Sequence, residues 1–408
     1  RTKHYLYDDP QAPGLLSGII DEKGNRYATW AYDAERRAVL SEHAGGADRT
    51  EVSYNSDGTV SVTNALGHVQ TYSFRRYNGK LKADVIEGAP CSGFPGGTET
   101  RSYDENGMLA EIQDAAGQSR SFAYNNRGLA TTVVTRTGSR IETQWHHEFS
   151  LPVKISEPER VTEFAYDDQL RVTQKTVRDR YSRTVRIWSY TYHPEGHNGA
   201  GLIAAIDGPR TDVNDTTQFS YDAEGNLVKT VNALGHEQHW GKYDAHGRPS
   251  EYIDANGTVW EMTYDNRGRL IKETGPRGEK TYQYDERGLL VSVTTPNGIT
   301  ITRTYDDAHR LISINDGLNN QQRWTLDALG NATLEQLQSA SGSVHWLYHQ
   351  TFNEIGWKTA ITDAYGNETA LGYDVVANLI QETDPTGDQY QYQYDGFHKR
   401  TLVRDPLG

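Results

Sequence analysis

Histidines close to acidic residues are the side chains of this sequence that could bind a metal ion or transfer protons. The segment His236-Glu-Gln-His239 approaches the zinc signature of metalloproteases. That signature needs its two histidines four residues apart on one helical face, whereas residues three apart in a strand point to opposite faces. We therefore predict no metal site at this segment. We interpret the other close histidine pairs as surface or turn residues: His146 with His147, and His193 with His197.

Other catalytic and cofactor-binding signatures are missing from the sequence. It contains no phosphate-binding loop, dinucleotide fingerprint or nucleophile elbow. No acid, base or nucleophile stands apart from a pattern that recurs along the whole chain. We accordingly predict no catalytic, cofactor-binding or metal-binding residues, no cofactor and no enzymatic activity.

The recurring pattern is a phrase such as Tyr264-Asp-Asn-Arg-Gly-Arg-Leu270, and it returns about every 21 residues. We call the position of Tyr264 in this phrase the slot. Eighteen slots follow one another along the chain: Tyr7, Tyr32, Tyr54, Phe74, Tyr103, Tyr124, Trp145, Tyr166, Tyr192, Tyr221, Tyr243, Tyr264, Tyr284, Tyr305, Leu326, Phe352, Tyr373 and Tyr394. A phrase at a constant interval is typical of a structural repeat, so we predict one continuous array over residues 1–408.

Each repeat contains two tight turns. Asp at the start of a type I turn accepts hydrogen bonds from nearby main-chain amides, and Gly at the fourth position adopts the left-handed conformation that follows. A second turn lies eleven to fourteen residues after the slot, as at 254–257 and 275–278. Two turns separate two strands, which predicts thirty to thirty-six short strands and almost no helix. The predicted structural residues are Tyr32, Asp33, Tyr103, Asp104, Gly107, Tyr221, Asp222, Gly225, Tyr243, Asp244, Gly247, Tyr264, Asp265, Gly268, Tyr284, Asp285, Gly288, Tyr305, Asp306, Tyr373, Asp374, Tyr394 and Asp395.

Composition and side-chain alternation indicate an all-β fold built as a single layer. Residues two before the slot are mostly aromatic and the residue between them is small or polar, a period of two that favours strands. Only 35% of residues are apolar, with 26 tyrosines, and the mean hydropathy is -0.77. Such a chain is too polar for several compact cores, so we expect a sheet with water on at least one face.

Charge, apolar runs and cysteine content exclude several classes of partner and of structure. A net charge of -14 disfavours nucleic acid and anionic membrane surfaces. The longest apolar run, 202–206, is far below the ~18 residues of a membrane span. Cys91 is the single cysteine, which excludes an internal disulfide. No leader peptide is recognised, and the repeats run to both ends, so we expect an interior piece of a longer protein.

In three stretches the interval between successive slots exceeds the usual 21 or so residues: 87–98, 178–217 and 335–350. Insertions in repeat proteins commonly form loops on one face. We interpret these stretches as longer surface loops or, alternatively, as contacts with cargo or a partner.

The Tyr-Asp-x-x-Gly-x-Leu phrase, as in Tyr264 to Leu270 and in Tyr305, Asp306 and Leu311, resembles the tyrosine-aspartate (YD) repeat of the bacterial Rhs family. Teneurins and the B and C subunits of insecticidal toxin complexes share this repeat. Three slots depart from the pattern. Trp145 is followed by His146, Leu326 replaces the aromatic residue, and Leu170 stands where Gly is expected after Tyr166.

The resemblance implies a β-hairpin ribbon that winds spirally into a hollow shell. The implied partners are the protein's own C-terminal toxin domain as enclosed cargo and a delivery apparatus reached through N-terminal regions outside these residues. The implied location is the bacterial cytoplasm before export and then the exterior or the cell surface. The family also has an autoprotease with a DPxG-like motif, which the segments 384–387 and 405–408 match superficially. Both lie at the ordinary offset of the second turn, so we interpret them as turns and expect the autoproteolytic site elsewhere.

Three function classes therefore compete. A shell segment that encapsulates a toxin is the leading one, an adhesion or carbohydrate-binding YD-repeat module is the second, and an enzyme is the weakest. Adhesion predicts an exposed pocket built from aromatic residues or loops, whereas encapsulation predicts a wide cavity lined by varied polar side chains and no single pocket.

Overall fold

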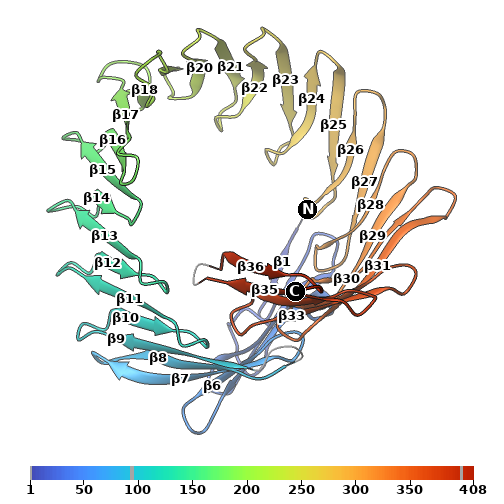
Figure 1. The fold of residues 1–408 in the computed structure, drawn as a ribbon. Coiled ribbons are helices and arrows are strands. Elements are labelled where there is room, and N and C mark those ends of the chain that lie inside the picture. Colours follow the sequence, from blue (N-terminus) through green and yellow to red (C-terminus); the bar gives the residue numbers. More distant parts are fainter. Residues whose placement is uncertain (1, 92–95, 396–397) are drawn as a thin grey trace. The chain divides into compact units, whose positions relative to one another are not determined.

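The chain folds almost entirely into β-strands, as a computed structural model shows for residues 2–91, 96–395 and 398–408 (Figure 1). These residues form 36 strands and a single 3-10 turn, η1 (Ala44–Gly46). The all-β prediction is confirmed, and the number of strands is at the upper end of the predicted range.

The first half of the chain contains strands β1 (His4–Leu6), β2 (Gly18–Ile20), β3 (Arg26–Tyr32), β4 (Ala38–His43), β5 (Ala47–Tyr54), β6 (Val60–Thr63), β7 (Val69–Tyr77), β8 (Lys80–Gly88), β9 (Gly97–Tyr103), β10 (Leu109–Gln113), β11 (Ser119–Tyr124), β12 (Ala130–Val134), β13 (Arg140–Trp145), β14 (Pro152–Ser156), β15 (Arg160–Tyr166), β16 (Val172–Asp179), β17 (Val185–Tyr192) and β18 (Ile203–Asp207). The second half contains β19 (Thr217–Tyr221), β20 (Leu227–Val231), β21 (Glu237–Tyr243), β22 (Pro249–Ile253), β23 (Val259–Tyr264), β24 (Leu270–Gly275), β25 (Gly278–Tyr284), β26 (Leu290–Thr294), β27 (Thr300–Tyr305), β28 (Leu311–Asn315), β29 (Gln321–Leu326), β30 (Ala332–Gln338), β31 (Val344–Phe352), β32 (Lys358–Thr362), β33 (Glu368–Tyr373), β34 (Leu379–Thr383), β35 (Gln389–Tyr394) and β36 (Arg400–Arg404).

These strands belong to one antiparallel sheet in which strands adjacent in sequence pair as hairpins. The chain divides into two compact units. One unit contains residues 1–121, 283–293 and 299–408, and the other contains residues 122–282 and 294–298. Because each strand pairs with the strands beside it in sequence, the ladder in each unit is built from local contacts.

Very few side chains are buried, as expected for a single layer. The buried apolar residues of the described chain are Ala12, Ala28, Ala47, Val293, Ala308 and Ala360. The chain exposes 23916 Å², whereas a compact monomer of this mass would expose about 16,000 Å². Stability therefore comes from ladder hydrogen bonds and from side chains that are half-buried against neighbouring hairpins.

The slot residue ends a strand and begins a β-bulge. Thr263 lies opposite Lys272 and Tyr264 lies opposite Leu270, so Ile271 is the extra residue of the second strand. The same shift in register occurs at Tyr221, Tyr305 and other slots. A bulge increases the local twist of a sheet. Its repetition gives successive hairpins the same twisted geometry.

The predicted turn at 275–278 is present as a two-residue hairpin loop in which Gly275 pairs with Gly278. Other segments differ from their sequence-based expectations. The stretch 335–350 forms no loop, because β30 and β31 extend through it to a tight turn at 339–343. The stretch 178–217 is strand in part, within β16, β17 and β18, but residues 193–202 and 208–216 form the longer loops that were predicted. In the stretch 335–350 the extra residues lengthen strands, because their side chains can still pair across the ladder. Within the stretch 87–98, residues 92–95 lie outside the described residues.

Candidate functional site

The first turn of most repeats is organised by one carboxylate. Asp265 Oδ1 accepts hydrogen bonds from the amides of Arg267 at 2.9 Å and Arg269 at 3.0 Å. The main chain closes the turn from Gly268 N–H to Asp265 O at 2.9 Å, and Gly268 has φ of 79°. The same pattern recurs at other predicted slots, where Tyr ends the strand and Asp begins the turn. Each turn is therefore specified within five consecutive residues.

The second oxygen of this carboxylate binds the side chain four residues later. Arg269 Nε donates to Asp265 Oδ2 at 2.8 Å, and this pair holds the pKa of Asp265 at about 2, below its ordinary value of 3.8. In other repeats Asn replaces Arg and donates to the same oxygen. The arginine repeats are Asp33 with Arg37, Asp167 with Arg171, Asp244 with Arg248 and Asp306 with Arg310. The asparagine repeats are Asp222 with Asn226, Asp327 with Asn331 and Asp374 with Asn378. Two second turns, at Asp316 with Asn320 and Asp363 with Asn367, use the same pairing.

In eight repeats the hydroxyl of the slot tyrosine joins the repeat to the one before it. Tyr264 Oη donates to the carbonyl of Pro249 at 2.9 Å, and Tyr305 Oη donates to that of Leu290 at 3.0 Å. Both acceptors lie six residues after the preceding slot. Equivalent bonds join Tyr32 to Leu16, Tyr54 to Ala38, Tyr103 to Ala83, Tyr166 to Pro152, Tyr192 to Val172 and Tyr243 to Leu227. This bond explains the prevalence of Tyr over Phe at the slot.

The departing slots keep much of this geometry with other residues. Trp145 Nε1 donates to the Ala130 carbonyl at 2.8 Å, in the manner of the tyrosine hydroxyl. His146 Nδ1 accepts from the amides of Glu148 and Phe149 at 3.2 and 3.3 Å, as a turn aspartate would. Leu170 takes the left-handed conformation of the missing glycine, with φ of 64°. The turn after Tyr166 therefore keeps the usual geometry, whereas the turn after Trp145 is one residue longer, because the His146 amide donates to the Leu151 carbonyl.

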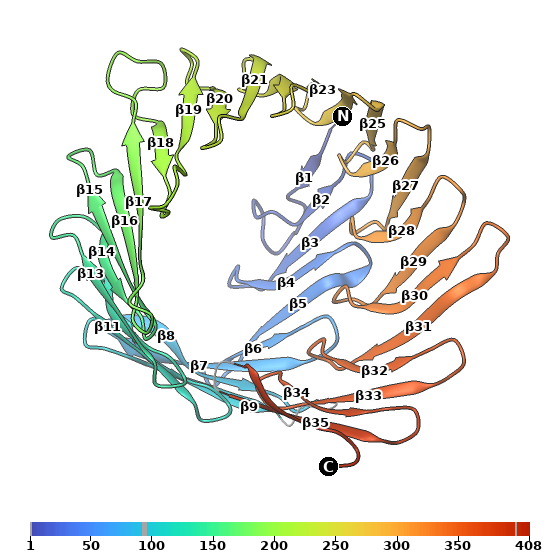
Figure 2. The same cartoon turned by 45° about the horizontal axis from the view of Figure 1, so that its top comes forward.

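A second set of contacts joins repeats that are far apart in sequence. In the first unit, second turns of early repeats meet first turns of late repeats (Figure 2). We call this line of contacts the seam. It comprises the turns at 21–25, 44–48 and 64–68 on one side and those at 285–289, 306–310, 327–331 and 353–357 on the other. Three of its hydrogen bonds, which involve Asn25, Asn64 and His309, join residues 282 to 290 positions apart.

Two polar side-chain contacts lie where the turns at 21–25 and 306–310 meet. His309 Nε2–H donates to Asp21 Oδ2 at 3.2 Å, and Asn25 Nδ2 donates to Asp307 Oδ1 at 2.9 Å. The Asp21 side chain is 0% exposed. Burial opposes its ionisation, but hydrogen bonds from the Asn25 and Lys23 amides and from His309 outweigh burial, so the pKa of Asp21 lies below its ordinary value. The carboxylate is therefore held as a buried anion at the seam.

An ion-paired cluster lies beside this contact. Lys23 Nζ is 3.3 Å from Asp285 Oδ2, which also accepts from Arg287 Nε at 2.8 Å. The Asp285 and Arg287 side chains are 8% and 4% exposed. Burial would raise the pKa of Asp285, but Arg287, the Leu289 amide and Lys23 lower it to about 2. This cluster adds a salt bridge to the seam.

Main-chain groups also bond across the seam. The Asp48 amide donates to the Ala328 carbonyl at 2.7 Å, and Asn64 Nδ2 donates to the Glu354 carbonyl at 2.7 Å. These bonds continue the contact along several successive hairpins. The seam is thus a polar joint with specific donors and acceptors.

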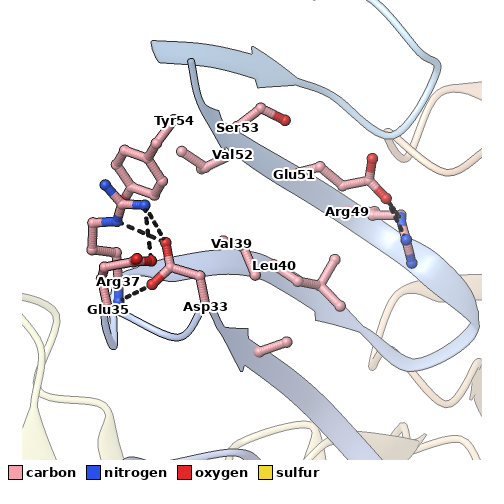
Figure 3. Close-up of a pocket in the computed structure, with 11 residues that line it drawn as sticks. Asp33, Glu35, Arg37, Val39, Leu40, Arg49, Glu51, Val52, Ser53 and Tyr54 are labelled. Carbon is pink, nitrogen blue, oxygen red and sulfur yellow. Dashed lines mark hydrogen bonds and ion pairs between the residues drawn. The ribbon is translucent and has the colours of Figure 1, made fainter. Parts of the chain in front are cut away.

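A shallow hollow of about 640 Å³ lies over β3, β4 and β5 (Figure 3). Its basic side chains are already paired. Arg37 binds Asp33 and lies 4.0 Å from the centre of the Tyr54 ring, while Arg49 binds Glu42 and Glu51. The hollow is open, and both of its arginines are already paired with carboxylates. It is therefore a surface depression of the ribbon.

The histidines at 236–239 and 193–197 contact residues that are close to them in sequence. His239 Nε2 is 3.0 Å from Glu237 Oε2, and the His236 amide donates to Asn232 in a second turn. The His193 and His197 rings stack at 4.4 Å. Within residues 2–91, 96–395 and 398–408, no three His, Cys, Asp or Glu side chains are grouped so that they could hold a metal ion. Over the same residues, no helix has the length and apolar character needed to cross a bilayer.

Known proteins share this repeat architecture. The teneurin YD-shell family matches residues 148–324 and 240–403, which together make up more than half of the chain. The chain belongs to the YD-shell family. The RHS repeat family matches residues 103–140. The resemblance inferred from the Tyr-Asp phrase is thereby confirmed.

Relatives of this YD-shell segment are much longer proteins. It is 25% identical over 362 residues to the probable deoxyribonuclease RhsB of Dickeya dadantii strain 3937, a match that covers 84% of this chain and 23% of that protein. The solved structure of TcdB2-TccC3-Cdc42 is similar with a TM-score of 0.57 at 14% identity, over 99% of this chain and 23% of that one. TcdB2-TccC3 is similar with a TM-score of 0.54 at 12% identity, over 96% and 28% of the two chains. The YD-shell segment thus spans about a quarter of the length of these proteins.

Sequence reasoning located the turns of the YD-shell segment but missed its seam. Lys23, Asn25 and Asn64 lie in ordinary second turns, and their residue types are common in turns. One signal was available, because His309 occupies a position where most repeats have Gly. A bulky residue at a left-handed position indicates a constraint from outside its own turn.

Proposed function

We propose that this YD-shell segment is part of the wall of a shell that encloses a toxin domain of the same polypeptide for delivery to competitor or host cells. The observation that carries the proposal is the seam. A ribbon whose edges bond to each other can form a continuous surface, because the gap between distant hairpins is closed by specific hydrogen bonds. A free adhesive ribbon would have no need for these contacts.

The surfaces of the segment support the same proposal. Its faces are polar and half-exposed, and the hollow over β3 to β5 carries internally paired charges. Such a surface can surround a protein without binding it tightly. In this proposal the segment has no catalytic role, and any enzymatic activity of the parent protein belongs to a domain outside these residues.

Protease protection of the enclosed domain tests the proposal. In the full-length parent protein, we expect the C-terminal domain to co-elute with the shell during size-exclusion chromatography after its cleavage. We also expect it to resist a protease that digests the same domain in isolation. Digestion at equal rates in the two samples would refute encapsulation and would favour the adhesion module.

A matched pair of variants makes the test specific for the seam. Asn25→Leu with Asn64→Asp removes two donors of the seam, and an aspartate oxygen can still accept the Leu66 and His68 amides that Asn64 binds in its own turn. Asn256→Leu changes a second turn of the other unit and is the control. We expect faster digestion of the enclosed domain in the seam variant than in the control.

A further inference from the structure

The turn at 306–310 carries a strained residue. His309 has φ of 65° at the position where Gly268 and Gly288 have φ of 79° and 100°. Its amide still closes the turn by donating to Asp306 O at 3.1 Å. A residue with a β-carbon is disfavoured in this conformation, whereas glycine adopts it freely. The local turn would therefore be more stable with Gly at this position.

The contacts of the His309 side chain lie across the seam. Its Nε2–H donates to the fully buried Asp21 carboxylate, and its ring stacks on Tyr27 with centroids 4.2 Å apart and an interplanar angle of 20°. Tyr27 also contacts His43, at 4.6 Å between centroids. The imidazole thus lies among groups from the turn at 21–25 and from β3 and β4.

The other late turns of the seam have glycine at the equivalent position. Gly288, Gly330 and Gly356 stand four residues after their slots, as His309 stands four residues after Tyr305. If the two sides of the seam slipped by one repeat, a glycine would face Asp21. The buried carboxylate would then lose its side-chain donor, which is unfavourable for a charged group with no exposed surface.

We propose that His309 is the positioning residue that fixes the lateral register of the seam. The imidazole selects one alignment of the two turn edges, and its contacts with Asp21 and Tyr27 offset the strain in its own turn. This inference concerns how the ribbon is joined to itself. It does not depend on whether the shell encloses a toxin.

Replacement of His309 by Gly, compared with a control, distinguishes a role of His309 in the seam from a role in its own turn. His309→Gly relaxes the turn and removes the contacts across the seam. Ala377→Gly is the matched control, because Ala377 has φ of 70° at the same position of a turn outside the seam. If His309 acted only within its own turn, both substitutions would stabilise the turn that carries them, and the two variants would behave alike in every other respect.

Hydrogen exchange of the Asp48 amide reports directly on the seam, because this amide donates across it to Ala328. In peptides spanning residues 44–54, we expect His309→Gly to accelerate exchange about tenfold, the factor that corresponds to loss of a hydrogen bond to a charged group. We expect no change in Ala377→Gly. Unchanged exchange in His309→Gly would overturn the proposal.

His309→Asn provides a second, independent variant. Asn tolerates the left-handed conformation, but its shorter side chain lacks the ring that stacks on Tyr27. We expect accelerated exchange at Asp48 in this variant also. Protection equal to that of the unsubstituted chain would show that the imidazole does not set the register.

Discussion

The hydroxyl of Tyr192 donates a hydrogen bond to the carbonyl of Val172, 2.8 Å away and one repeat earlier. The guanidinium of Arg171 lies 4.3 Å from the centre of the same ring. One side chain therefore ends a strand, receives a cation on its face and joins two successive repeats. This arrangement accounts for the recurrence of Tyr, and it leads to a direct test.

Substitution of Tyr192 by Phe should lower the free energy of unfolding by about 1 kcal/mol, the typical contribution of one hydrogen bond. The ring and its packing remain, so the loss reports the hydroxyl alone. Tyr365→Phe is the control, because Tyr365 lies at a turn tip and is 91% exposed. Urea denaturation of both variants provides the measurement, and equal stabilities would contradict the role of the hydroxyl.

Acidification should weaken the turns whose aspartates are paired with arginine. The Arg269 guanidinium lowers the pKa of Asp265 to about 2 from 3.8. A carboxyl whose pKa is lower in the folded state stabilises the fold above its unfolded pKa, and that contribution is lost as the pH falls through the folded value. We therefore expect the melting temperature to fall between about pH 4 and pH 2.

Asp265→Asn should reduce this dependence on pH. The amide oxygen can still accept the two turn amides, as Asn125 does from Arg127 and Leu129 at 3.0 Å each. The charge is removed while the turn is retained. A melting curve with the same pH dependence as that of the unsubstituted chain would show that this aspartate contributes nothing to acid sensitivity.

Replacement of Gly268 by Val should destabilise its hairpin by roughly 1 to 2 kcal/mol, because a β-branched residue is disfavoured at φ of 79°. Asn, which adopts this conformation more readily, should be better tolerated. Either side chain displaces the mobile end of Arg248, so the comparison isolates the backbone preference. Thermal unfolding measures the difference, and equal effects of Val and Asn would refute it.

The reverse substitution, Leu170→Gly, should stabilise its turn by about 1 kcal/mol, because Leu170 holds φ of 64°. Leu170 is half-buried, and its loss of apolar contact opposes part of this gain. Hydrogen exchange of β15 and β16 would detect slower local opening. Faster opening of these strands would show that packing of the leucine outweighs the backbone strain.

The sequence by itself determined the repeat unit and its two turns. The interactions that build them act over five residues, as Asp265 shows with the amides of Arg267 and Arg269. Alternating aromatic and polar side chains determined the strands for the same reason, because each strand pairs with its neighbours in sequence. Local chemistry repeated at a constant interval is sufficient to predict an all-β ribbon.

Only the tertiary structure decided how distant hairpins meet. Asp21 and His309 are 288 residues apart, and neither residue type nor spacing indicates that one donates to the other. The sequence also left two other features open. These are the carbonyl that accepts each slot hydroxyl and the formation of long strands in 335–350, and both depend on the register of strand pairing. A small change in twist at each bulge accumulates over many repeats, so the partners across the seam depend on the whole intervening chain.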